Sequence, residues 1–139
     1  MSGRNWADAA AQDSGQAMVE LALVFLVFAT LVFGGLEFTR ALTAWTVVTA
    51  ASREGARTAA VSCSMSAACA TNVDARVAGA LTGLDVAMAD WSMDPAPYVS
   101  GNPITVHVQY TLTPVVPLIA VLIPGGVFTI NADATMRLE

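Results

Sequence analysis

The stretch LALVFLVFATLVFGGL, residues Leu21–Leu36, decides the fold of this chain, because it contains no charged side chain. The apolar segment extends back to Gln16 and includes one acid, Glu20. With a rise of about 1.5 Å per residue, a helix from Gln16 to Leu36 is about 30 Å long, the thickness of a bilayer's hydrocarbon core. The sequence therefore predicts a single transmembrane helix near the N-terminus.

Two other interpretations of this segment are a cleaved secretory signal peptide and a buried helix of a soluble domain. A signal peptide begins with a basic region, whereas Met1–Ser14 contains one basic residue, Arg4, and two acidic ones, Asp8 and Asp13. The small-x-small triplet Val48-Thr49-Ala50 has suitable chemistry for cleavage but lies too far beyond the apolar core. A chain of 139 residues is also short for burying such a helix. We therefore favour the membrane span.

The composition agrees with a membrane protein and excludes several other classes. The chain is 55% hydrophobic and 12% charged, with a mean hydropathy of +0.61, which is unlike a disordered chain. A net charge of −5 argues against a nucleic-acid binder, which needs a basic face. One histidine and two cysteines are too few for the usual zinc sites, and no phosphate-binding glycine loop is present. We expect no cofactor and no metal.

The helix is expected to continue beyond the membrane, because no proline occurs before Pro95. Residues at alternating four- and three-residue steps define one face that tapers from bulky to small, and we expect the rest of the chain to cover its later half. This face consists of Phe38, Leu42, Trp45, Thr49, Ser52, Ala56 and Ala59. The i,i+3 pairs Glu37/Arg40 and Glu54/Arg57 are interpreted as a solvated flank.

Cys63 and Cys69 are six residues apart, which on an unbroken helix offsets them by about 9 Å along the axis, too far for a disulfide. A disulfide therefore requires the helix to end near Val61. The alternative is two free, partly buried thiols. A closely spaced pair suits an oxidising compartment, and Arg4 favours a cytoplasmic N-terminus although Arg40 argues against it. We expect the C-terminal part to lie outside the cytoplasm.

The remaining chain predicts a small α+β head. A short second helix is expected to start at Thr71 with a capping box over Thr71–Asp74. Residues 86–91 could form a strand, and strict alternation of apolar and polar residues predicts strands over 104–112 and 128–136. The predicted fold is a long N-terminal transmembrane helix continuing into a head with a short helix and an antiparallel sheet of about three strands, which packs on the helix from Trp45 to Ala59.

Between the last two strands, the segment PVVPLIAVLIPGG over residues 114–126 is too short to span a bilayer and contains two internal prolines. We expect a long apolar loop or a turn of helix. It could pack on the sheet edge, dip into the outer leaflet of the membrane, or contact a neighbouring subunit.

Few residues carry recognisable chemistry. His107 lies on the polar side of a predicted strand, without a nucleophile placed by any motif, so a surface histidine is the favoured interpretation. Asp90 and Asp94 could bind a cation or simply flank a turn. Glu20 near the start of an apolar helix is costly in lipid. It either has a partner or sits among the headgroups, where it complements the helix N-terminus.

The residues Gly15-Gln16-Ala17-Met18-Val19-Glu20, opening an apolar helix, resemble the cleavage site of type IV prepilins. The longer string GQAMVELALVFLVFATLVFGGLEF, followed by TRAL, AASREGARTAA and the terminal TINADATMRLE, is similar to the TadE-like pseudopilins of tight-adherence (Tad/Flp) pilus systems. The similarity covers the long helix and the C-terminal strand, roughly half of the chain.

This resemblance implies a structural, non-enzymatic minor pilin or pseudopilin. A prepilin peptidase would cut between Gly15 and Gln16, removing residues 1–15 as a leader, and Glu20 would pair with the new amine of Gln16. Residues 16–60 would form the long helix and residues 61–139 the extracytoplasmic head. The implied partners are the prepilin peptidase, other pilins or pseudopilins of the same pilus, the Tad inner-membrane assembly platform and the lipid bilayer.

Two rival hypotheses concern other classes of protein. One is an unprocessed single-pass membrane protein that acts as an interaction or secretion-apparatus subunit, for which Glu20 is incidental. The other is a small membrane-tethered enzyme that uses His107.

Overall fold

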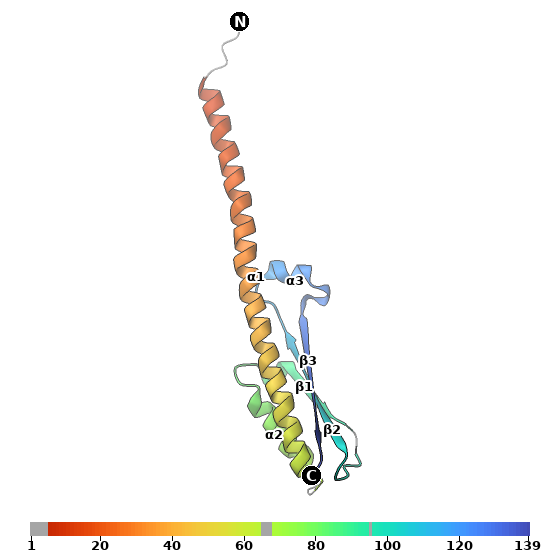
Figure 1. Cartoon of the computed structure of the whole chain (residues 1–139). Coiled ribbons are helices and arrows are strands. Elements are labelled where there is room, and N and C mark those ends of the chain that lie inside the picture. The colour runs from red at the N-terminus through yellow and green to blue at the C-terminus, as the bar shows by residue number, and fades with distance from the viewer. Residues whose placement is uncertain (1–5, 65–67, 95) are drawn as a thin grey trace. The chain divides into compact units, whose positions relative to one another are not determined.

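The computed structural model describes residues 6–64, 68–94 and 96–139, and for residues 6–14, 118 and 122 it describes the backbone only. Arg4, the one basic residue of the expected leader, lies outside the described residues, as does Pro95. The chain divides into two compact units, residues 1–36 and 37–139. The expected α+β class is confirmed: a long N-terminal helix precedes a short helix and a three-stranded antiparallel sheet (Figure 1).

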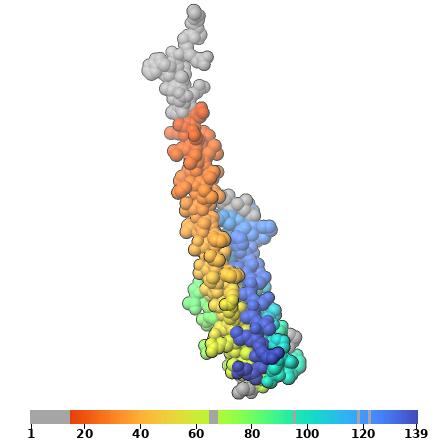
Figure 2. Space-filling view, in the orientation of Figure 1, coloured from red at the N-terminus to blue at the C-terminus, as the bar shows by residue number. Residues whose placement is uncertain are grey.

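Helix α1 (Trp6–Ser62) contributes to both units. It is rich in alanine, leucine and valine and contains no proline, so nothing interrupts its hydrogen bonds. Its end at Ser62 confirms the end expected near Val61. In the first unit, the side chains from Gly15 to Leu36 are almost all exposed, and they lie open on the face seen in Figure 2.

The sheet of the second unit has the order β1-β2-β3, with both pairs antiparallel. Strands β2 (Pro103–Leu112) and β3 (Phe128–Arg137) pair along ten residues, and the five-residue β1 (Ala89–Met93) pairs with the middle of β2. Alternating side chains point to opposite faces. Ile104, Val106 and Val108 are therefore buried on one face, while His107 and Gln109 are exposed on the other.

The apolar face of the sheet shares one core with the later part of α1, as expected, but the expected contact face is partly wrong. Trp45 is 51% exposed, whereas Ala44 and Val48 are 1% and 0% exposed. The small residues farther along are buried as expected, since they let the strands approach the helix closely. From position 44 onward, the buried residues of α1 are Ala44, Val48, Ala51, Ser52, Gly55, Ala56, Ala59 and Ala60.

Two buried valine side chains approach Gly55 of α1 closely. A Cβ placed on it would lie 2.6 Å from Val77 Cγ2 and 3.1 Å from Val106 Cγ1. Both valines are fully buried. Since carbon atoms in proteins pack at about 3.5–4.0 Å, any larger residue at position 55 requires these valine side chains to shift.

Helix α2 (Cys69–Ala80) begins two residues before the expected Thr71, and the predicted capping box is wrong. The N-cap residue is Ala68, which makes no side-chain capping bond. The reason lies in Cys69, which is joined to Cys63 by a disulfide at a Cα–Cα distance of 4.7 Å. The disulfide and the burial of Cys69 (4% exposed) fix the position of the first residue of α2, so the helix begins there without a side-chain cap.

Two irregular segments complete the second unit. The strand considered for residues 86–91 begins only at Ala89, because the 3₁₀ turn η1 (Val86–Met88) precedes it and the Asp85 carboxylate accepts a bond from Ala87 N–H. Between β2 and β3 lie helix α3 (Pro117–Leu122) and the 3₁₀ turn η2 (Pro124–Gly126). Of the two expectations for this segment, a long apolar loop or a turn of helix, the structure shows the helical one.

Candidate functional site

The expected cleavage motif lies on the exposed surface of α1. Gly15, Gln16 and Glu20 are all exposed. A Cβ placed on Gly15 would meet nothing within 4 Å, so packing among the described residues does not require glycine there. Within the described part of the chain, the Glu20 carboxylate has no hydrogen-bonding or ionic partner. The motif is therefore accessible to an external partner.

The apolar run that follows has the properties of a membrane-crossing helix. Among the described residues, one helical segment, Gly15–Ser62, is long and apolar enough to cross a membrane, and its most apolar part has a mean hydropathy of 2.4 and is 0% buried within the protein. Phe25, Leu31 and Phe33 are 65%, 71% and 48% exposed. An apolar surface of this extent is unfavourable in water. One long N-terminal helix of this chain could therefore span a membrane.

Glu37, the first residue after this run, is a functional candidate that the sequence interpretation missed. It was expected on a solvated flank, but it is 4% exposed. Its Oε1 accepts hydrogen bonds from the backbone N–H groups of Val115 at 2.6 Å and Val116 at 3.1 Å. Its Oε2 lies 2.7 Å from Arg40 Nη1. Glu37 thus fastens α1 to the loop after β2, which we call the Glu37 latch.

The second expected pair on α1 also has a tertiary partner. Glu54 Oε1 lies 3.9 Å from Nη1 of Arg76 on α2, with side chains 38% and 66% exposed. At that exposure and distance the pair contributes little to stability. A firmer link to α2 comes from β1, where Trp91 Nε1 donates to Asp74 Oδ1 at 2.8 Å.

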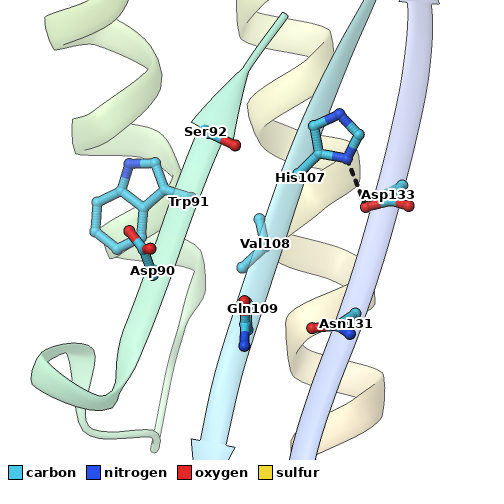
Figure 3. Close-up of a pocket in the computed structure, with 8 residues that line it drawn as sticks. All are labelled: Asp90, Trp91, Ser92, His107, Val108, Gln109, Asn131 and Asp133. Carbon is cyan, nitrogen blue, oxygen red and sulfur yellow. Dashed lines mark hydrogen bonds and ion pairs between the residues drawn. The ribbon is translucent and has the colours of Figure 1, made fainter.

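The solvent-facing side of the sheet carries two rows of polar side chains across the three strands (Figure 3). Because the strands are in register, Ser92, His107 and Asp133 form one row, and Asp90, Gln109 and Asn131 form the next. These rows line an open hollow of about 250 Å³, together with Trp91 and Val108. Six of the eight residues that line the hollow, all but Trp91 and Val108, have polar side chains.

His107 occupies the centre of its row and is held by two carboxylates. Its Nδ1 lies 2.8 Å from Asp133 Oδ1, and its Nε2 lies 3.6 Å from Asp94 Oδ1. The hydrogen bond to Asp133 raises the pKa of His107 above its ordinary 6.5 against the opposing effect of partial burial, and Asp94 acts in the same direction as Asp133. The expected surface position of His107 is confirmed, since its side chain is 46% exposed.

The row has the residue types of a hydrolytic triad but not its connections. The His107 ring is hydrogen-bonded to Asp133 and lies near Asp94, and within the described residues no hydrogen bond joins it to Ser92 Oγ. A general base must reach the proton that it abstracts. The Asp94 carboxylate also accepts from Thr105 N–H at 3.0 Å, so it ties β1 to β2. In the described part of the chain, no group of three or more acidic, histidine or cysteine residues is placed to hold a metal ion.

The fold and the exposed apolar helix define an α+β protein with one N-terminal segment that could cross a membrane. A family model described as "TadE-like protein" matches residues 15–57, that is, the segment from the glycine of the expected cleavage motif to Arg57. This match confirms the resemblance noted in the sequence over the long helix and is consistent with a TadE-like protein of the Tad system. No curated protein and no solved structure matches the chain. The TadE-like pilus family is structural, and the match suggests involvement in a Tad pilus together with other pilus components.

Proposed function

We propose that this protein is a structural, non-enzymatic minor pilin or pseudopilin that takes part in assembly of a Tad/Flp-type pilus. The observation that carries the proposal is the family match, which begins at Gly15 and covers the apolar run. In this proposal the helix crosses the inner membrane once, and residues 61–139 lie outside the cytoplasm. Its partners are other pilins or pseudopilins of the same pilus, the Tad assembly platform and the lipid bilayer.

A prepilin peptidase cuts between Gly15 and Gln16 in this proposal. The exposure of both residues supports it, because a protease must reach the scissile bond. The open space around Gly15 supports it further, since a side chain there would obstruct no other part of the described chain. In this proposal, Gly15 therefore serves recognition by the peptidase and not the packing of the chain.

After cleavage, the free amine of Gln16 stands one helical turn before Glu20. A carboxylate in lipid is costly, and an ammonium group beside it removes much of that cost. Within the described residues Glu20 has no other partner. The amine comes from the same subunit or from a neighbour, and in the second case the pair sets the axial position of one subunit against the next.

N-terminal sequencing of the protein from membranes that contain the cognate peptidase tests the proposal. The expected N-terminus is Gln16, and Gly15→Val should leave the chain folded but uncut. Glu20→Gln, which keeps the shape and removes the charge, should be cut normally and incorporated into pili less well. A protein that still starts at Met1 beside fully assembled pili would overturn the proposal. It would favour the alternative, an unprocessed single-pass interaction or secretion-apparatus subunit.

A further inference from the structure

The segment between β2 and β3 presents apolar surface that the proposed assembly role does not use. Residues 114–128, PVVPLIAVLIPGGVF, contain no polar or charged side chain. Val115 and Val121 are 71% and 83% exposed, and Val127 is 36% exposed. A cluster of exposed aliphatic side chains in an uncharged segment marks an interaction surface. We call residues 115–127 the apolar foot.

The Glu37 latch determines where the apolar foot begins. The carboxylate of Glu37 binds the backbone N–H groups of Val115 and Val116, and all three residues belong to the second unit. Glu37 is also the next residue after Leu36, where the apolar run ends. The residue that binds the start of the foot is therefore the first one after the proposed membrane span in the chain.

The backbone of the foot is prepared for an environment that offers few hydrogen bonds. Ile119 and Ala120 N–H both donate to Val116 C=O, at 3.0 and 3.2 Å, and Gly126 N–H donates to Ile123 C=O at 3.0 Å. Pro117 and Pro124 have no N–H to satisfy. Backbone groups in lipid must be paired within the protein, so these internal bonds suit a membrane surface.

Lipid fits this surface better than a protein partner does. Protein interfaces ordinarily include a polar rim and about one hydrogen bond per 100–200 Å², whereas the side chains of the foot can supply none. Arg40 stands one helical turn after the apolar run with its side chain 43% exposed. An arginine at that level suits the anionic headgroup region.

We propose that the apolar foot inserts into the interfacial layer of the outer leaflet, beside the point where the helix leaves the membrane. The occupant of this surface is the lipid bilayer. The foot then gives the extracytoplasmic unit a second membrane contact, additional to the helix. This inference rests on the membrane span of the proposed function.

Depth-dependent quenching in vesicles tests the inference. The full-length protein is reconstituted into phosphatidylcholine–phosphatidylglycerol vesicles with one fluorescent label, attached at Val121→Cys, Ser100→Cys or Val27→Cys without reductant. The protein without an introduced cysteine is the control for background labelling, because Cys63 and Cys69 are joined to each other and should not react. Ser100 is exposed and precedes β2, so the length of the strand, about 30 Å, separates it from the residues that follow Leu112.

Lipids carrying a nitroxide on the headgroup should lower the fluorescence of the Val121 label about twofold or more and leave the Ser100 label nearly unchanged. Lipids carrying the nitroxide deep in the acyl chain should quench the Val27 label, which reports the membrane span itself. Val121→Asp, with the label moved to Val127→Cys, should remove the quenching. Because Val121 is 83% exposed, this substitution leaves the fold intact.

The outcomes separate the two proposals. Quenching at Val27 with none at Val121 overturns the apolar foot and leaves the span standing. No quenching at either position means that the span itself has failed. Equal quenching at Val121 and Ser100 overturns the foot as a specific contact. A Val121 label shielded from both lipid nitroxides and aqueous iodide indicates a protein occupant, which also overturns the inference.

Discussion

The buried carboxylate of Glu37 is the feature whose removal should change the second unit most. Glu37→Ala removes a buried carboxylate that accepts hydrogen bonds from the backbone N–H groups of Val115 and Val116 and contacts Arg40; Glu37 is 4% exposed. A hydrogen bond to a charged group contributes about 1.5–3 kcal/mol. Val115 is 71% exposed, so water can replace part of its bond. We therefore expect a loss of about 2–4 kcal/mol in the free energy of unfolding.

Urea unfolding of the detergent-solubilised protein, followed by tryptophan fluorescence, measures this loss. Glu54→Ala is the matched control, because Glu54 is on the same helix with a side chain that is 38% exposed and a partner 3.9 Å away. It should cost no more than about 0.5 kcal/mol. Amide exchange localises the effect, since the N–H groups of Val115 and Val116 should exchange faster in Glu37→Ala alone. Equal stability losses in the two variants, with unchanged exchange, would refute the latch.

Three further changes probe the second unit. Gly55→Ala should lower the free energy of unfolding by about 1–2 kcal/mol because its Cβ overlaps Val77, whereas Gly79→Ala, whose Cβ meets nothing within 4 Å, should raise it by up to about 1 kcal/mol. Urea titrations should show these opposite signs, and stabilisation of both variants would contradict the reasoning. The raised pKa of His107 means that its ion pairs stabilise the fold fully below pH 6.5 and less as the pH rises through the folded-state pKa. At 46% exposure that contribution stays under about 1 kcal/mol, and His107→Ala should flatten the decline in stability measured between pH 6 and 9. Replacing Cys63 and Cys69 with serine should cost about 2 kcal/mol, as the closure of a short loop predicts, and a reductant should then have no further effect on the unfolding midpoint.

Several elements of the fold follow from local patterns in the sequence. The run Leu21–Leu36 specifies an apolar helix, because it contains no charged side chain and, apart from Thr30, no polar one. Period-two alternation over 104–112 specifies a strand with one buried face, and the structure places β2 there. Both patterns depend on the spacing of neighbours along the chain, so they are legible without a tertiary structure.

Only part of the candidate site could be predicted from the sequence. The cleavage motif is contiguous, and Gly15, Gln16 and Glu20 could be named directly. His107 could be placed on a polar strand face, but its partners Asp94 and Asp133 depend on the register of three strands. The contact face of α1 was misplaced at Trp45, because a helical stripe identifies which residues align and not which neighbour covers them.

By itself, the sequence determined the apolar helix, the alternating strands and the contiguous motif at Gly15, since each is encoded by residues only a few positions apart. The tertiary structure decided the role of Glu37, which meets Val115 across 78 residues of chain, and the need for glycine at position 55, between Val77 and Val106. The physical reason is that burial, hydrogen-bond pairing and steric fit are properties of contacts between distant segments. A glutamate followed three residues later by an arginine has the same local pattern on a solvated flank as in a buried latch.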